Sequence, residues 1–245
     1  MTIILLSFLL IGLWVWRIIQ SSPCQVGRVG ERRVSRKLDW LPKEYRILND
    51  ILLKSPSGTT QIDHIVVSPY GIFIIETKNY KGWILGHENA QEWKQSLLGK
   101  KKLFGKRIEQ HKFRNPILQN QAHVNVIKRL VSPIGNFPII PIVVFSEKAE
   151  LKITVPNHIV ITWSRLRKTM KKFHEHVIPD SEVHKIVAAI RTANITDKKA
   201  RKNHAMSVQE ISDELDFPSQ SVFGKYFKRV EGMSPKAYRQ SLLKD

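Results

Sequence analysis

The chain has little cysteine and little negative charge. Cys24 is the single cysteine among 245 residues, so no internal disulfide can form and nothing points to an oxidising compartment. There are 21 Asp and Glu residues against 40 Lys and Arg, which gives a net charge of +19. This balance points to a polyanionic partner or an anionic membrane surface, and charge alone does not choose between them. No internal repeat or long low-complexity tract is present. Apolar residues make up 42% of the chain, enough for a core, which argues against disorder as its main state.

The N-terminal segment 2–19 carries no charge before Arg17. As a helix, its first 15 or so residues span about 22 Å, which is short against about 30 Å of bilayer hydrocarbon. Extension to the end of the segment makes it long enough, with Arg17 snorkelling and Trp14 and Trp16 at the interface. The alternative is a cleaved signal peptide. Since the segment lacks a basic start and a small-residue cleavage site, we expect an uncleaved anchor over residues 1–20.

Basic residues follow this segment and none precede it. They are Arg17, Arg28, Arg32, Arg33, Arg36 and Lys37. The positive-inside rule then predicts a single-pass protein of the inner membrane whose remaining domains lie in the cytoplasm.

The rest of the chain alternates helical and strand-like patterns. The pattern predicts a helix over 26–41, strands over 45–53, 60–68 and 72–78, a helix over 116–131, and strands over 138–146 and 158–162. This order predicts an α/β domain with a mixed sheet flanked by helices. Residues 93–114 are rich in lysine and arginine and predict a basic loop or surface. The expected domains are an anchor over 1–20, an α/β domain over 21–170, a helical linker over 171–202 and a small all-α unit over 203–245.

Asp63, Glu76 and Lys78 stand on adjacent predicted strands that have no packing reason to carry charge. If the turn at 68–71 is a two-residue loop, Asp63 lies opposite Glu76 at about 5 Å between Cβ atoms, and Lys78 shares the face of Glu76. Two carboxylates so close repel each other unless a cation lies between them. Mg²⁺ (or Mn²⁺) takes carboxylate oxygens plus waters, and the lysine can orient or deprotonate an attacking water or stabilise charge on a phosphate.

Two alternatives stay open for this hairpin. A one-residue bulge at Gly71 sends Asp63 to the other face, and the charges can also belong to a solvated strand end. Ile74 and Ile75 favour a buried strand, in which unpaired charge is costly. We expect His64 in the core or on the surface rather than as a ligand. His174 and His176 lack further paired ligands, so no zinc site is predicted.

Several ordered motifs resemble the NERD (nuclease-related) domain, which is related to the PD-(D/E)xK restriction-endonuclease-like phosphodiesterases. The motifs lie at 27–31, 61–82, 93–95 and 116–124, and the resemblance spans about 24–146. It implies a restriction-endonuclease-like fold and a metal-dependent nuclease core. The site positions it implies are Glu31, Asp63, Glu76, Lys78 and Gln119, with Asp63 and Glu76 as metal ligands. Ile62 stands where the related families have proline.

The pattern of the last forty residues predicts two or three short helices. Ser207 and Glu210 form a capping box for the first, and Pro218 starts a second with clustered aromatic residues. This stretch resembles the helix-turn-helix of AraC-type transcription regulators. The resemblance implies major-groove contacts from Gln220, Ser221 and Lys225, and phosphate contacts from Lys228 and Arg229. Asp216 replaces the turn glycine, and only one of the usual two units is evident, so we expect weak or nonspecific DNA binding.

Together these features predict a membrane-anchored, Mg²⁺-dependent nuclease that hydrolyses phosphodiester bonds of DNA, with an accessory helix-turn-helix. The alternative is a membrane-tethered, AraC-like DNA-binding regulator whose nuclease-like domain is catalytically silent. The sequence leaves open DNA against RNA, endonuclease against exonuclease action, and the oligomeric state.

Overall fold

The computed structural model describes residues 23–56, 58–102, 105–197, 201, 217, 220–235 and 237–238. The expected anchor over 1–20 and the expected first helix of the tail lie outside these residues. Within the described ranges, no helix is both long enough and apolar enough to cross a membrane.

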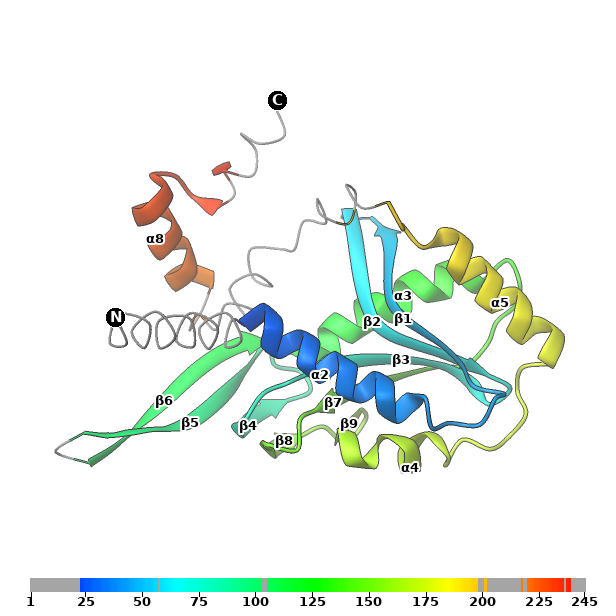
Figure 1. Cartoon of the computed structure of the whole chain (residues 1–245), viewed down its shortest axis with the longest axis horizontal. Helices are drawn as coiled ribbons and strands as arrows, with labels where there is room; N and C mark the ends of the chain where they lie inside the picture. Colours follow the sequence, from blue (N-terminus) through cyan, green and yellow to red (C-terminus); the bar gives the residue numbers. More distant parts are fainter. Residues whose placement is uncertain are drawn as a thin grey trace, which may run out of the picture.

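A five-stranded mixed sheet forms the centre of the fold, in the order β1-β2-β3-β7-β9 (Figure 1). Its strands are β1 (Arg46–Ser55), β2 (Gly58–Ser68), β3 (Gly71–Lys78), β7 (Ile139–Phe145) and β9 (Ile159–Thr162). The first three pair antiparallel, and β7 and β9 continue the sheet in parallel with β3. The predicted strands and the mixed α/β class are therefore confirmed.

Helices cover both faces of this sheet. On one face lie α2 (Pro23–Leu38), the short 3-10 turn η1 (Trp163–Arg165) and α4 (Leu166–Met170), and on the other lie α3 (Pro116–Val131) and α5 (Asp180–Ala193). Side chains of β3 alternate between the two cores, since Phe73 packs toward α2 and Ile74 toward α3 and α5. The helix α5 falls in the expected linker over 171–202, yet its residues Val183, Ile186 and Ile190 are buried against the sheet.

A smaller four-stranded sheet has the order β6-β5-β4-β8. Its strands are β4 (Gly82–His87), β5 (Glu92–Lys102), β6 (Gly105–Arg114) and β8 (Ala149–Thr154). The basic segment over 93–114, predicted as a loop or surface, is the antiparallel hairpin β5–β6, so the loop prediction was wrong. Buried Trp93 and Gln95 alternate with exposed Lys94, and this period of two was hidden by the many basic residues.

The turn between β2 and β3 is the two-residue loop that the site requires. Ser68 pairs with Gly71, and the register runs without a shift to the pair of His64 and Ile75. Gly71 has a φ of 138°, and an added Cβ would clash with the side chain of Ile140. The alternative of a bulge at Gly71 is therefore excluded.

Candidate functional site

The ladder between β2 and β3 opens immediately beyond His64 and Ile75. At this point the carboxylate of Asp63 replaces the ladder bond, because its Oδ2 accepts a hydrogen bond of 2.7 Å from the backbone N–H of Thr77. The other edge of β3 stays paired with β7 through Lys78. Asp63 therefore lies where the edge of β3 that faces β2 is no longer paired, while the other edge of β3 is still paired with β7.

The neighbouring strand β1 is distorted opposite Asp63. Asp50 has a left-handed φ of 55°. The residues on either side of Asp50 pair with the residues on either side of Asp63, but Asp50 and Asp63 do not pair with each other. Ile62 and Ile65 both pack into the core under α3 and α5, so the alternation of side chains along β2 is interrupted between them. This interruption frees Asp63 from the regular ladder.

Glu76 and Lys78 form a buried ion pair on the α3 side of β3. Lys78 Nζ lies 3.1 Å from Glu76 Oε1, and the exposed fractions of the two side chains are 18% and 3%. The ammonium also donates a hydrogen bond of 3.0 Å to Oε1 of Gln119 on α3. The structure therefore brings Gln119 to the same place as the two predicted residues of β3.

His123, which was not predicted, also lies at this site. Its Nε2 is 3.3 Å from Glu76 Oε2, and its Nδ1 is 2.9 Å from the hydroxyl of Thr60 on β2. It stands one helical turn after Gln119, so the spacing of four residues on a predicted helix could have found it. Asn120 anchors this helix by donating to the carbonyl oxygens of Ile74 and Ile142.

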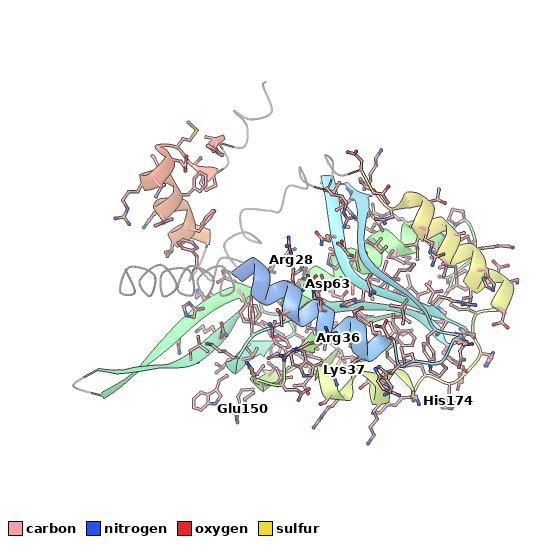
Figure 2. The ribbon with its side chains drawn as sticks, viewed as in Figure 1. Arg28, Arg36, Lys37, Asp63, Glu150 and His174 are labelled. Atoms are coloured by element: carbon pink, nitrogen blue, oxygen red, sulfur yellow. The ribbon has the colours of Figure 1, made fainter. Side chains whose placement is uncertain are left out.

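Glu31 reaches the site from α2 on the opposite side of the sheet. The helix passes close to the end of β3, because a Cβ added at Gly30 would lie 2.7 Å from Cβ of Asn79. Glu31 is half-buried, and its charge acts on the carboxyl of Asp63. Figure 2 shows Asp63 beside α2. All five predicted residues thus come from four elements that meet at the open edge of β3.

In the tail, the structure describes the helix α8 (Gln220–Glu231). Phe223 is buried against Phe217 and Phe227, with ring centroids 5.2 and 5.6 Å apart. The residues predicted to contact DNA, apart from Gln220 at the start of the helix, are exposed. These are Ser221, Lys225, Lys228 and Arg229.

Comparison with known proteins identifies both parts of the chain. The family described as nuclease-related domain, NERD, matches residues 26–146. Residues 26–146 belong to the NERD family. Residues 202–240 match the bacterial regulatory helix-turn-helix proteins of the AraC family, so both resemblances are confirmed. An uncharacterized protein of Bacillus anthracis is 36% identical over 183 residues, which cover 73% of this chain and 81% of that protein. No solved structure matches the chain.

The charges of the NERD site influence one another strongly. Burial, and then the charges of Glu76 and Glu31, raise the pKa of Asp63 well above its usual value. Burial opposes ionisation of Glu76 as well, but Lys78 and His123 hold its pKa below the usual value. Burial also opposes the charge of Lys78, yet the nearby carboxylates raise its pKa. Lys78 is therefore an ammonium ion in this arrangement.

His64 differs from the site residues. Its Nδ1 lies 2.7 Å from Oδ1 of Asn49, and burial lowers its pKa to about 4. The ring is therefore neutral at pH 7, and it lies in the core, one of the two places expected for it.

The donor atoms of the NERD site fit a hard divalent cation. Oε2 of Glu76 is buried without a hydrogen-bond partner, since the nearby His123 is not aligned to donate. Mg²⁺ is commonly bound through one or two carboxylates with waters and substrate phosphates, which matches Asp63 and Glu76. In the part of the chain that the structure describes, no three His, Cys, Asp or Glu residues gather as a metal site. Carboxylate oxygens are ligands that Mg²⁺ and Mn²⁺ commonly take in proteins.

Proposed function

We propose that this NERD protein is a metal-dependent nuclease that hydrolyses phosphodiester bonds of DNA. The observation that carries the proposal is the convergence of Asp63, Glu76 and Lys78 where β2 leaves β3. Asp63 is held by the N–H of Thr77 at 2.7 Å, and Glu76 is held by Lys78 at 3.1 Å. A buried carboxylate with a second, partly buried carboxylate and an ammonium near it has little value for stability, but it suits the binding of a cation and of phosphate.

Each side chain has a distinct role in this proposal. Asp63 and Glu76 would hold Mg²⁺ or Mn²⁺, which when bound supplies an activated water and neutralises phosphate charge. Lys78 presents a positive charge that can stabilise the oxygens of the reacting phosphate. Gln119 fixes the ammonium through the hydrogen bond of 3.0 Å to its Oε1. Glu31 adds negative charge near Asp63 and thereby favours cation binding.

The remaining parts of the chain would bring the substrate and the enzyme together. The AraC-type helix-turn-helix would retain DNA near the nuclease, through the exposed residues of α8. The segment over 1–20 would anchor the protein in the inner membrane with the other domains in the cytoplasm. Extraction of membranes at alkaline pH tests the anchor, because an integral protein stays in the pellet and a peripheral one is released.

Cleavage of duplex DNA by the full chain in detergent, titrated with Mg²⁺, tests the proposed activity. We expect cleavage that stops with a chelator and falls by more than about 100-fold in Glu76→Gln, because a metal ligand is lost. The matched control is Glu150→Gln, since Glu150 is exposed on β8 and lies well away from Asp63 in Figure 2. Metal-independent cleavage, or equal cleavage by Glu76→Gln, would contradict the proposal. Binding of DNA without any cleavage would favour the silent regulator.

A further inference from the structure

The β5–β6 hairpin extends beyond the rest of the four-stranded sheet (Figure 1). Its two strands contain eight basic residues and two acidic ones. The basic residues are Lys94, Lys100, Lys101, Lys102, Lys106, Arg107, Lys112 and Arg114. The candidate site uses none of them, so their concentration on one hairpin needs a separate explanation.

The pairing of the two strands places lysine opposite lysine twice. Lys94 is the partner of Lys112, and Lys101 is the partner of Lys106. Like charges directly opposite each other destabilise a strand pair. Lys112 reaches Glu92 at 3.3 Å with 54% of its side chain exposed, whereas Lys94 is exposed and pairs with no carboxylate among the described residues. Because such pairs do not favour stability, binding of an anionic partner explains them better than folding does.

The base of the hairpin is rigid. Trp93 and Phe113, which are partners in the register, are buried in the core of the smaller sheet. Lys94 comes directly after Trp93, and Lys112 comes directly before Phe113. Because side chains alternate along a strand, this lysine pair lies on the opposite, solvent-facing side of the hairpin. The charged face therefore stands on a packed apolar support.

Asn115 joins this base to the candidate site. Its Nδ2 donates to the carbonyl oxygens of Glu88 and Ala90, and its Oδ1 accepts from the N–H of Ile117 at the start of α3. One helical turn later, α3 presents Gln119 to Lys78. The hairpin and the nuclease site are thus connected through a short, hydrogen-bonded junction.

We propose that the face of the β5–β6 hairpin that carries Lys94 and Lys112 binds the phosphate backbone of duplex nucleic acid and guides it to the nuclease site. This inference rests on the proposed function. A two-stranded ribbon fits the major groove, which is about 12 Å wide. A duplex presents a phosphate about every 1.7 Å along its axis.

An anionic membrane surface is the competing partner for a basic hairpin. A membrane contact needs charge at the outer end of the hairpin, but it gives no reason for a lysine pair at the base. The pair of Lys94 and Lys112 lies next to buried Trp93 and Phe113 and close to the helix that carries Gln119. The position of this pair therefore favours nucleic acid.

The test measures binding of a fluorescent DNA duplex to the full chain by anisotropy, with a chelator present and over a range of salt. In the double variant Lys94→Gln/Lys112→Gln, we expect the slope of log K against log salt to become shallower by about 2. The affinity at 0.1 M salt should fall about 10- to 100-fold. The control Lys168→Gln/Lys171→Gln removes the same charge from exposed positions of α4 and of the residue after it, and should bind like the wild type.

Two further results separate a binding role from a structural one. Glu92→Gln should tighten binding, because it removes the carboxylate that lies 3.3 Å from Lys112. The double variant should unfold at the same temperature as the wild type or higher, since it relieves repulsion between two lysines. Weaker binding together with a lower unfolding temperature would overturn the proposal.

Equal binding by the wild type and the double variant would also overturn it, as would an equal loss in the control on α4. Flotation with phosphatidylserine-containing vesicles forms the second arm. Loss of vesicle binding with unchanged duplex binding would overturn the proposal in favour of a membrane surface. Failure of the wild type to cleave DNA with Mg²⁺ would remove the proposed function and leave the binding result intact, so the two failures are distinguishable.

Discussion

A single buried imidazole connects Glu76 on β3 to Thr60 on β2. His123 is 3% exposed, with Nδ1 at 2.9 Å from the threonine hydroxyl and Nε2 at 3.3 Å from Glu76 Oε2. If the hydroxyl donates to Nδ1, the proton of a neutral ring is on Nε2 and faces the carboxylate. The ring then lies against the carboxylate without a hydrogen bond to it, and this contact limits where Oε2 can move, as outer partners of metal ligands commonly do.

At the residue scale, we therefore predict that His123→Gln weakens Mn²⁺ binding by about 10- to 100-fold. The binding is measured directly by calorimetry or by electron paramagnetic resonance, so that the result does not depend on catalysis. His184→Gln is the control, because His184 is exposed on α5. Unchanged Mn²⁺ affinity in a folded His123→Gln variant would show that the contact has no positioning role.

Regular strand geometry predicted Asp63, Glu76 and Lys78, whereas Glu31 and Gln119 were expected only from the resemblance to the NERD domain. The two-residue turn is as expected, and the register runs to His64 and Ile75, one pair short of Asp63 and Glu76. Alternation along β3 places Lys78 with Glu76. The hydrogen bond from Thr77 to Asp63 could not be predicted in this way. It lies beside the interruption of the β1–β2 pairing at Asp50, whose left-handed conformation is uncommon for a residue other than glycine.

At the scale of elements, the β2–β3 turn sets the register of the site. Gly71→Ala adds a Cβ at a φ of 138° and places it against the side chain of Ile140. Gly58→Ala is a matched control with a φ of 128° and no atom within 4 Å of its Cβ. We expect Gly71→Ala to lower the free energy of unfolding by about 1–3 kcal/mol more than the control does, because of overpacking.

Urea unfolding followed by circular dichroism measures this difference. Equal losses in the two variants would mean that Ile140 moves aside without cost. Since the turn fixes the register, Gly71→Ala should also reduce nuclease activity more than the control does.

The helix α8 carries the second prediction at this scale. Lys228 is exposed in its last turn, where the AraC resemblance implies a phosphate contact. In Lys228→Ala, the slope of log K against log salt for duplex binding should become shallower by about 1, with affinity reduced for all sequences alike. Lys185→Ala, at a side chain of α5 that is 64% exposed, serves as the control. A slope unchanged from the wild type would place Lys228 outside the DNA contact.

Helices and strands were predicted best where the spacing of apolar residues and the capping residues indicated the same boundaries. Asn115 caps α3 and Pro116 begins it, and this helix ends at Val131 as predicted. The β5–β6 hairpin was missed because its charged residues obscured a period of two, which only the burial of Trp93 and Phe113 reveals. The packing of α5 on the sheet was not predicted either, because an amphipathic pattern shows that a helix has an apolar face but not which surface that face packs against.

At the scale of the whole molecule, the charge of +19 is spread over several parts of the chain. The β5–β6 hairpin, the helix α8 and the basic residues of α2 each present cations, while the acidic residues at the nuclease site gather at one edge of β3. Such a distribution attracts a polyanion to the surface, and the carboxylates that we propose to bind a cation lie apart from these basic parts. It suits a nuclease that retains its substrate electrostatically and cleaves it at an inner site.

The central claim is that Asp63 and Glu76 hold the metal on which cleavage depends. The most direct measurement is a parallel titration, on one preparation of the full chain, of Mn²⁺ occupancy and of the rate of DNA cleavage. The account predicts that rate and occupancy rise together in the wild type and in Glu150→Gln, and that both are lost in Asp63→Asn and in Glu76→Gln. Cleavage that proceeds before the metal binds, or that survives in either of these two variants, would contradict it.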